Sequence, residues 1–496
     1  MRLRERIGPG LNWQLVVPIV SGGLLAVGLG MLACCAFAVV GGDGGVFAFG
    51  APAAVIIPLS TLGVLSARRL TSLPLRPRDG FFAVTATWVA AALAGAVPLL
   101  LEGTFDSPGD AIFESMSGIT TTGATLLAVI EDEPHSVLLW RSIMQWLGGV
   151  GIVVLVVAIA PATGLATQRV FYAELSGFSA DRLTPRIADT AKIITGVYLA
   201  LTTAGIVAFS FAGMGPFDAL NHALTSVATG GFSTRTASIA AFDSVAVELV
   251  AIVLMIAGAV NFAFYWLALR GRDRLWPQAA EVRAFFGILV AGTAVISLAL
   301  AVTDDARDFA DSLRSSSFTV VSLVTSTGYT TVDFDEWNDF ARLTGLVLMF
   351  VGGCAGSTAG GMKVIRVMIL AKAFAQELGR QLRPRAVQVL HTRGRVYSEE
   401  VRRGVLGFFL VYMVVFMLGT LTMAAFGLDE VSAAASTVAT LNIIGPALGE
   451  VGATENYAAV PEGGRWVLTL LMLMGRLEIF TVLVLLTPAF WRRNIA

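Results

Sequence analysis

Long apolar segments alternate with short polar ones along nearly the whole chain. Each apolar segment is long enough to cross a bilayer as a helix. Ten can be marked, at about 13–40, 46–67, 80–101, 136–160, 190–213, 244–269, 283–302, 341–376, 403–427 and 465–490. The eighth is interrupted by glycines. The pattern predicts an all-α polytopic membrane protein.

Four polar, glycine-centred runs lie between pairs of these segments. They read SGITTTGAT at 117–125, SVATGGFST at 226–234, VTSTGYTTV at 324–332 and ATLNIIGPA at 439–447. Aligned on one glycine each, at Gly123, Gly230, Gly328 and Gly445, the runs recur about every 100 residues. A recurrence of this kind indicates a fourfold internal repeat.

Each run follows a short segment of about a dozen residues, which is half a bilayer at the helical rise. These segments begin near Asp110, Asp218, Asp311 and Asp429. An acid suits a helix N-terminus, so the negative C-terminal end of each short helix would point at the polar run. Backbone carbonyls there can replace the water around a cation, and glycine tolerates the positive φ that turns them inward. The four runs therefore read as the parts of a cation filter.

Non-helical backbone at membrane depth must be buried in protein or line water. We therefore expect four tandem helix–pore-loop–helix repeats around one pseudo-fourfold pore, with two N-terminal accessory helices. The expected divisions are an accessory region at 1–70 and repeats at 71–165, 166–272, 273–385 and 386–496.

Composition and charge agree with this architecture. The chain is 56 % hydrophobic and 14 % charged with a mean hydropathy of +0.76, which excludes an ordinary soluble globule. With a cytoplasmic N-terminus, most Lys and Arg fall on the inner side, so both termini are expected in the cytoplasm. Most acids fall outside, where they would attract cations unless they are merely solvated. The three cysteines lie at membrane depth, so neither a disulfide framework nor a metal cluster is expected.

The glycine run at 352–361 cannot hold a helix, because each glycine costs about 1 kcal/mol relative to alanine. A loop able to block the path below the filter is one interpretation, and a kink for packing is another. A nucleotide P-loop is disfavoured, because Met362 precedes Lys363 and no strand comes before the run. The candidate gate residues in this run are Gly352, Gly353, Gly356, Ser357, Thr358, Gly360 and Gly361.

Arg476 lies near the middle of the last apolar segment. An arginine there costs about 2.5–3.5 kcal/mol on insertion scales, so its charge must be compensated. We expect it to face the pore, bond carbonyls of the glycine run and repel a cation below the filter. The alternative is a structural ion pair with Glu478.

The candidate filter residues come from all four runs. They are Thr121, Thr122 and Gly123; Thr229, Gly230 and Gly231; Thr327, Gly328 and Tyr329; and Asn442, Ile443, Ile444 and Gly445. Asn442 and Pro446 make the fourth run unlike the others, which suggests looser selectivity. A dense basic segment from Arg380 to Arg403 is either a solvated inner loop or a dock for a cytosolic partner or anionic lipid.

Six sequence motifs together resemble the bacterial Trk/Ktr/HKT superfamily of potassium transporters. They are TTTGAT at 120–125, ATGGFSTRTASI at 228–239, STGYTT at 326–331, GGCAGSTAGGMKVIRV at 352–367, TLNIIGPALGEV at 440–451 and GRLEIF at 475–480. The two extra N-terminal spans, WLGGVGIVVL at 146–155 and LTPRIADTAK at 183–192 resemble the TrkH/TrkG branch.

The resemblance implies potassium uptake across the bacterial inner membrane, with K⁺ as the transported ion and no organic cofactor. It further implies a homodimer with one pore per subunit, surrounded by membrane lipids and gated by the broken-helix loop, Arg476 and a cytosolic nucleotide-binding RCK ring. No nucleic-acid partner is expected. Three alternatives stay open: an alternating-access symporter coupled to sodium or protons, a weakly selective monovalent cation channel, and an intramembrane enzyme. The first would usually carry ionisable residues in several spans, where we find mainly Arg476. The third would need a catalytic constellation, which the sequence lacks.

Overall fold

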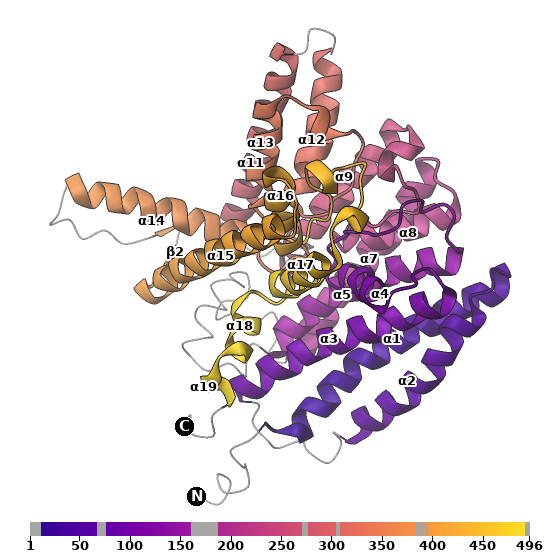
Figure 1. The fold of residues 1–496 in the computed structure, drawn as a ribbon. Helices are drawn as coiled ribbons and strands as arrows, with labels where there is room; N and C mark the ends of the chain where they lie inside the picture. The colour runs from indigo at the N-terminus through magenta and orange to yellow at the C-terminus, as the bar shows by residue number, and fades with distance from the viewer. Residues whose placement is uncertain are drawn as a thin grey trace, which may run out of the picture.

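The structure is a computed structural model. It describes residues 11–66, 76–159, 187–269, 276–303, 308–382, 391–392 and 395–491. Apart from the pairing of β1 (His391–Thr392) with β2 (Arg395–Val396), the described chain consists of helices and the loops between them (Figure 1). The all-α prediction is confirmed.

The two N-terminal helices, α1 (Trp13–Gly41) and α2 (Val46–Ser66), pack against each other and beside the first repeat. Glycines bring them close to their neighbours: a Cβ atom on Gly28 would overlap Ile57, and one on Gly30 would crowd Trp140. In lipid, close backbone packing of this kind replaces the hydrophobic drive that acts in water. These helices are the expected accessory pair.

Four repeats of helix, short helix and helix follow. The first repeat has α3 (Pro77–Glu102), α4 (Pro108–Ile119) and α5 (His135–Ile159), and the second has α7 (Ile187–Phe211), α8 (Pro216–Val227), α9 (Val245–Ala259) and α10 (Phe262–Leu269). The third has α11 (Trp276–Thr303), α12 (Phe309–Val324), α13 (Asp339–Met349) and α14 (Val364–Leu382). The fourth has α15 (Glu399–Ala425), α16 (Glu430–Leu441), α17 (Glu462–Arg476), α18 (Phe480–Leu486) and α19 (Pro488–Trp491). Short 3₁₀ turns follow three of the pore loops, at η3 (Ser238–Phe242), η5 (Phe334–Glu336), η6 (Gly449–Val451) and η7 (Tyr457–Ala459).

Each of the ten expected spans corresponds to helix in the structure. Within the described ranges, six helices are long and apolar enough to cross a membrane, and the pairs α9–α10 and α17–α18 raise the number to 8 if each bent pair is one span. Those pairs bend by 93° and 119°, which the sequence pattern did not predict. The remaining two are α5, whose last side chains are not described, and α13 with α14. The break expected in the eighth span is confirmed between Met349 and Val364.

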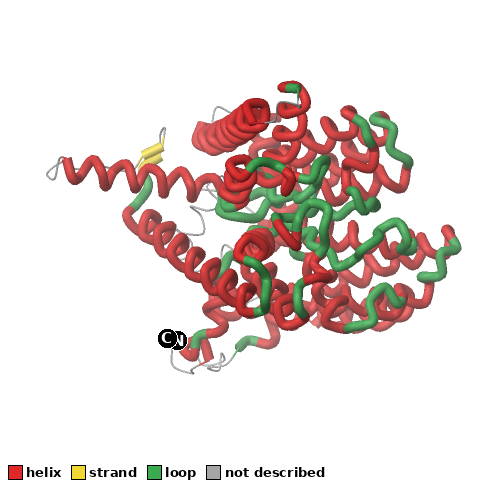
Figure 2. The backbone as a smooth tube through the Cα atoms, turned by 45° about the horizontal axis from the view of Figure 1, so that its top comes forward, coloured by secondary structure: helices red, strands yellow, loops and turns green. Residues whose placement is uncertain are grey.

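The four pore helices, α4, α8, α12 and α16, have 12, 12, 16 and 12 residues. Asp110, Asp218 and Asp311 lie in the first turn of their helices, and Asp429 caps the fourth. The expected acidic starts are therefore confirmed. The loops that follow gather in the middle of the molecule, among the helices (Figure 2).

Several predictions concern residues outside the described part. The expected repeat boundaries after 70, 165, 272 and 385 all lie outside it, as does most of the basic segment from 383 to 394. At its described edge, Arg402 and Arg403 both contact Glu399 on α15.

Candidate pore and filter

The ends of the four pore helices share one backbone pattern. The residue after each helix cap has a positive φ, and so does the glycine two residues further on. The paired positions are Thr121 and Gly123, Thr229 and Gly231, Ser326 and Gly328, and Ile443 and Gly445, with φ between 50° and 91°. The fourfold repeat therefore extends from the helices to individual backbone angles.

The carbonyl oxygens between these paired positions form a ring. They belong to Thr122, Gly230, Thr327 and Ile444. A Cβ atom on each filter glycine would overlap such an oxygen in the next repeat: Gly123 faces Gly230, Gly231 faces Thr327, Gly328 faces Ile444, and Gly445 faces Thr122. These approaches close on themselves in chain order, so the four segments surround one axis. Glycine is required both for the space and for the positive φ.

The structure corrects the alignment of the second repeat by one residue. The sequence comparison used Gly230, but Gly231 has the positive φ of 79° and lies three residues after the helix cap at Ala228. Gly230 instead occupies the place of Thr122 and supplies a ring carbonyl. Because Gly230 and Gly231 are adjacent, residue type alone could not decide which of them is equivalent to Gly123. Counting residues from the end of the preceding short helix would have identified Gly231.

Three further residues take places that the motifs alone did not show. Ser326, which the sequence analysis left out of the filter, has a φ of 54° and is the third-repeat equivalent of Thr121. The Tyr329 hydroxyl lies 2.5 Å from Thr225 Oγ1, behind the second repeat. Asn442 is a helix cap, and its Oδ1 accepts a hydrogen bond of 2.9 Å from Tyr412. The Tyr329 and Asn442 side chains therefore bond the neighbouring helices α8 and α15.

The glycine loop, residues 352–361, lies directly against the filter segments. The backbone N–H of Gly360 donates to Ser326 Oγ at 2.6 Å, and Thr358 Oγ1 lies 3.3 Å from Thr229 Oγ1. A Cβ atom on Gly360 would overlap the Ile443 side chain. The loop thus contacts the first positive-φ residue of three of the four repeats.

Arg476 joins this loop to α5. Its side chain is only 4 % exposed, and it donates to the carbonyls of Thr358 and Gly148 at 2.8 Å each. The expected bond between Arg476 and a carbonyl of the glycine run is confirmed. The alternative partner, Glu478, instead bonds Arg366 of α14 at 2.5 Å.

More ionisable side chains surround the glycine loop than the sequence analysis found. Glu281 of α11 is 4 % exposed and accepts a hydrogen bond from the Ala355 N–H at 2.8 Å. Lys363 donates to the Ala359 carbonyl at 2.6 Å, and Arg366 is buried. Arg476 is therefore one of several buried ionisable side chains beside this loop. Lys363 and Arg366 fall within the eighth apolar segment and Glu281 lies just before the seventh, so the apolar pattern did not single them out.

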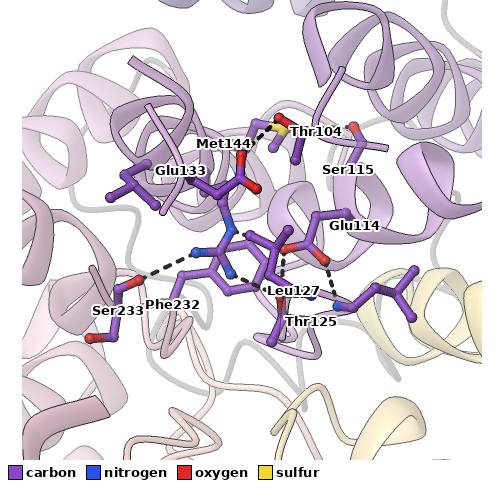
Figure 3. A network of polar contacts seen from close by, with 12 residues as sticks. Thr104, Glu114, Ser115, Thr125, Leu127, Glu133, Met144, Phe232 and Ser233 are labelled. Atoms are coloured by element: carbon purple, nitrogen blue, oxygen red, sulfur yellow. Dashed lines mark hydrogen bonds and ion pairs between the residues drawn. The ribbon is translucent and has the colours of Figure 1, made fainter. Parts of the chain in front are cut away.

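A buried ion pair behind the filter was also missed. The Nε of Arg141, on α5, donates to Glu114 Oε1 at 2.9 Å, and both side chains are at most 1 % exposed. Figure 3 shows Glu114 in this network, with Phe232 and Ser233 of the second run nearby. Glu114 also accepts from the Leu126 N–H, while Arg141 donates to the Ser233 carbonyl and lies 4.0 Å over the Phe232 ring. The pair therefore ties the segment after the first polar run, at Leu126, to Phe232 and Ser233 at the end of the second run.

Neutral or partly exposed groups join two further pairs of neighbouring repeats, the third with the fourth and the fourth with the first. The Asp335 carboxylate accepts from the Gly449 N–H at 2.7 Å, which links the third repeat to the fourth. Tyr457 donates through its hydroxyl to the Gly445 carbonyl at 2.6 Å and through its N–H to the Thr125 carbonyl at 2.9 Å. Asp335, one of the acids between residues 333 and 339, therefore has a structural role.

Comparisons with known proteins agree on one family. A family model named TrkH and described as a cation transport protein matches residues 51–493. A Trk system potassium uptake protein TrkH from Vibrio parahaemolyticus is 42 % identical over 84 % of this chain and 87 % of its own length. A Trk system potassium uptake protein TrkI from Halomonas elongata is 34 % identical over 97 % of this chain and 98 % of its own.

A solved structure matches the whole arrangement. The crystal structure of the potassium transporter TrkH from Vibrio parahaemolyticus superimposes with a TM-score of 0.88 at 39 % identity, covering 97 % of this chain and 100 % of the other. The resemblance found in the motifs is confirmed.

Proposed function

The chain belongs to the TrkH family of cation transport proteins, and we propose that it takes up potassium through a channel-like pore with a four-part selectivity filter. The relatives are named potassium uptake proteins. The chain is accordingly a transporter and not an enzyme.

The closed ring of four backbone carbonyls is the observation that carries this proposal. The oxygens of Thr122, Gly230, Thr327 and Ile444 lie at equivalent places in four repeats around one axis. Carbonyl rings replace the hydration shell of a potassium ion in known filters. The C-terminal ends of four pore helices also point toward this region, and their dipoles favour a cation there.

The glycine loop and Arg476 form the closed gate in this proposal. The loop contacts Thr229, Ser326 and Ile443 just past the ring. Arg476 places a buried positive charge against the loop, which would repel a cation leaving the filter. Opening then requires the loop to leave the filter and the arginine to lose its contact with Thr358.

A cytosolic RCK ring would act on this gate through α14. This helix begins at Val364, directly after the loop, and extends away from the rest of the molecule (Figure 1). Movement of its far end would reach the loop without an intervening linker. We further propose a homodimer in the bacterial inner membrane with both termini in the cytoplasm.

The second candidate function is an alternating-access cation symporter. Buried Glu281, with Lys363 and Arg366 close to the same loop, favours it, because ionisable groups at membrane depth often mark coupled transport. A weakly selective monovalent cation channel is the third candidate function. Asn442 and Pro446, which make the fourth filter run unlike the other three, suggest it.

Tracer rubidium uptake into proteoliposomes tests these readings. A channel-like pore predicts uptake that follows the membrane potential, proceeds without a sodium or proton gradient and is blocked by excess potassium more than by sodium. Uptake that requires one of those gradients in fixed stoichiometry would establish the symporter. Equal block by sodium and potassium would establish the weakly selective channel.

A further inference from the structure

One face of α5 lies between the first and second filter segments. Arg141 and Gln145 are four residues apart and so lie on the same side of the helix. The glycines that follow allow close approach: a Cβ atom on Gly148 would overlap the Ile119 carbonyl, and one on Gly149 would crowd Ala228. Side chains on this face therefore reach the filter backbone itself.

Gln145 makes two hydrogen bonds to the second filter segment. Its side chain is fully buried, its Nε2 donates to the Gly230 carbonyl at 2.6 Å, and its Oε1 accepts from the Phe232 N–H at 3.1 Å. The orientation of the amide follows from its partners, because a backbone N–H can only donate and a carbonyl can only accept. The amide N–H must therefore face Gly230.

This contact singles out one member of the carbonyl ring. The Gly230 carbonyl oxygen lies against Gly123. The carbonyl oxygens of Thr122, Thr327 and Ile444 lie in the same way against the other three filter glycines. Within the described residues, no comparable hydrogen bond reaches those three carbonyls. Among the described residues, a side chain thus holds one quarter of the ring, and none holds the other three.

We propose that Gln145 is a positioning residue for ion selectivity, which sets the place of the Gly230 carbonyl in the ring. This inference rests on the proposed potassium function and names a determinant of it. The hydrogen bond holds the oxygen back toward α5 and opposes contraction of the ring. A ring that cannot contract binds a small dehydrated cation poorly, so Gln145 favours potassium over sodium.

Two substitutions separate the donor from the volume of the side chain. Gln145→Glu keeps the size and the acceptor for the Phe232 N–H but replaces the donor by an oxygen. Gln145→Met keeps the approximate volume and removes both polar groups. We expect both to raise the sodium-to-potassium permeability ratio roughly fivefold, the change in an equilibrium that corresponds to one neutral hydrogen bond.

Trp146→Phe is the matched control on the same helix. It also removes one side-chain hydrogen bond, from Trp146 Nε1 to Thr202 Oγ1 at 3.1 Å, but that bond leads to α7 and not to the filter. This variant should keep the ratio of the unsubstituted protein. Reversal potentials or competitive rubidium uptake in proteoliposomes give the ratio independently of how much protein is active.

The outcomes distinguish this inference from the proposed function. Unsubstituted protein that shows no preference for potassium would refute the function itself. Normal preference that persists in both Gln145 variants, or that falls equally in Trp146→Phe, would overturn the role of Gln145. A rise confined to the Gln145 variants supports it, even where their melting temperature is lower, because lost stability alone changes the amount of flux and not its ratio.

Discussion

Removing the arginine beside the glycine loop should open the pore. In an Arg476→Ala protein the loop loses the hydrogen bond of 2.8 Å between the guanidinium and the Thr358 carbonyl. A hydrogen bond from a charged donor contributes about 1.5–3 kcal/mol, so the open form should gain roughly tenfold to a hundredfold in population.

The lost charge acts in the same direction. A cation 4 Å from a guanidinium meets a repulsion of about 4 kcal/mol at an effective dielectric constant near 20. Basal rubidium flux without any cytosolic partner should therefore rise at least roughly tenfold, the lower limit set by the hydrogen bond alone. Deleting residues 356–360 should raise it as well, because the part of the loop that covers Ser326 is gone.

The assay is tracer flux in proteoliposomes, normalised to the amount of detergent-stable protein. Arg476→Lys is the informative companion, because a lysine keeps the charge but cannot reach two carbonyls with a planar fork. Arg314→Ala is the control, because Arg314 pairs with Glu248 at 2.7 Å and not with a residue of the glycine loop, and its side chain is 43 % exposed. Normal or reduced flux from both Arg476→Ala and the deletion would refute the gate. A fall in yield and melting temperature without extra flux would make Arg476 structural.

Three other predictions concern the filter, its support and the partner. Gly231→Ser should abolish uptake, because the serine side chain would overlap the Thr327 carbonyl and because a residue with a side chain disfavours the φ of 79°. Gly230→Ser should perturb the same segment differently, by crowding Gln145, and equal, normal uptake from both variants would reject the corrected register. Arg141→Met should destabilise the protein by about 3–5 kcal/mol, because Glu114 stays buried without its charge partner, and adding Glu114→Leu should restore much of the loss in melting temperature. Binding of an RCK ring to the segment 380–403 should weaken with salt; binding that is unchanged by ionic strength and by neutralising the arginines of this segment would exclude it as the dock.

The architecture could be predicted from sequence because its signals are local. Span length, a break at five glycines and an acid such as Asp110 at the start of a short helix all act within a few residues of where they are read. The ring of carbonyls followed from the polar runs for the same reason. Only the second run was misaligned, because Gly230 and Gly231 offer the same residue type in two registers.

The supports behind the filter could not be predicted in this way. Glu114 and Arg141 are 27 residues apart, and Gln145 and Gly230 are 85 apart, so nothing in the local pattern connects them. Arg141 in particular lies near the N-terminal end of a span, where an arginine resembles an ordinary interfacial residue. Its partner becomes visible only when the pore helix folds back into the membrane beside α5.

A pore built from one chain responds to a substitution differently from a pore built from four identical subunits. In a homotetramer any substitution appears four times, so a donor placed behind one carbonyl is placed behind all of them. Among the described residues, Gln145 bonds one of the four ring carbonyls, that of Gly230, and the Arg141–Glu114 pair joins the first two repeats. Because the four quarters have separate sequences, a substitution in this chain changes one wall of the candidate filter and leaves the other three as they are.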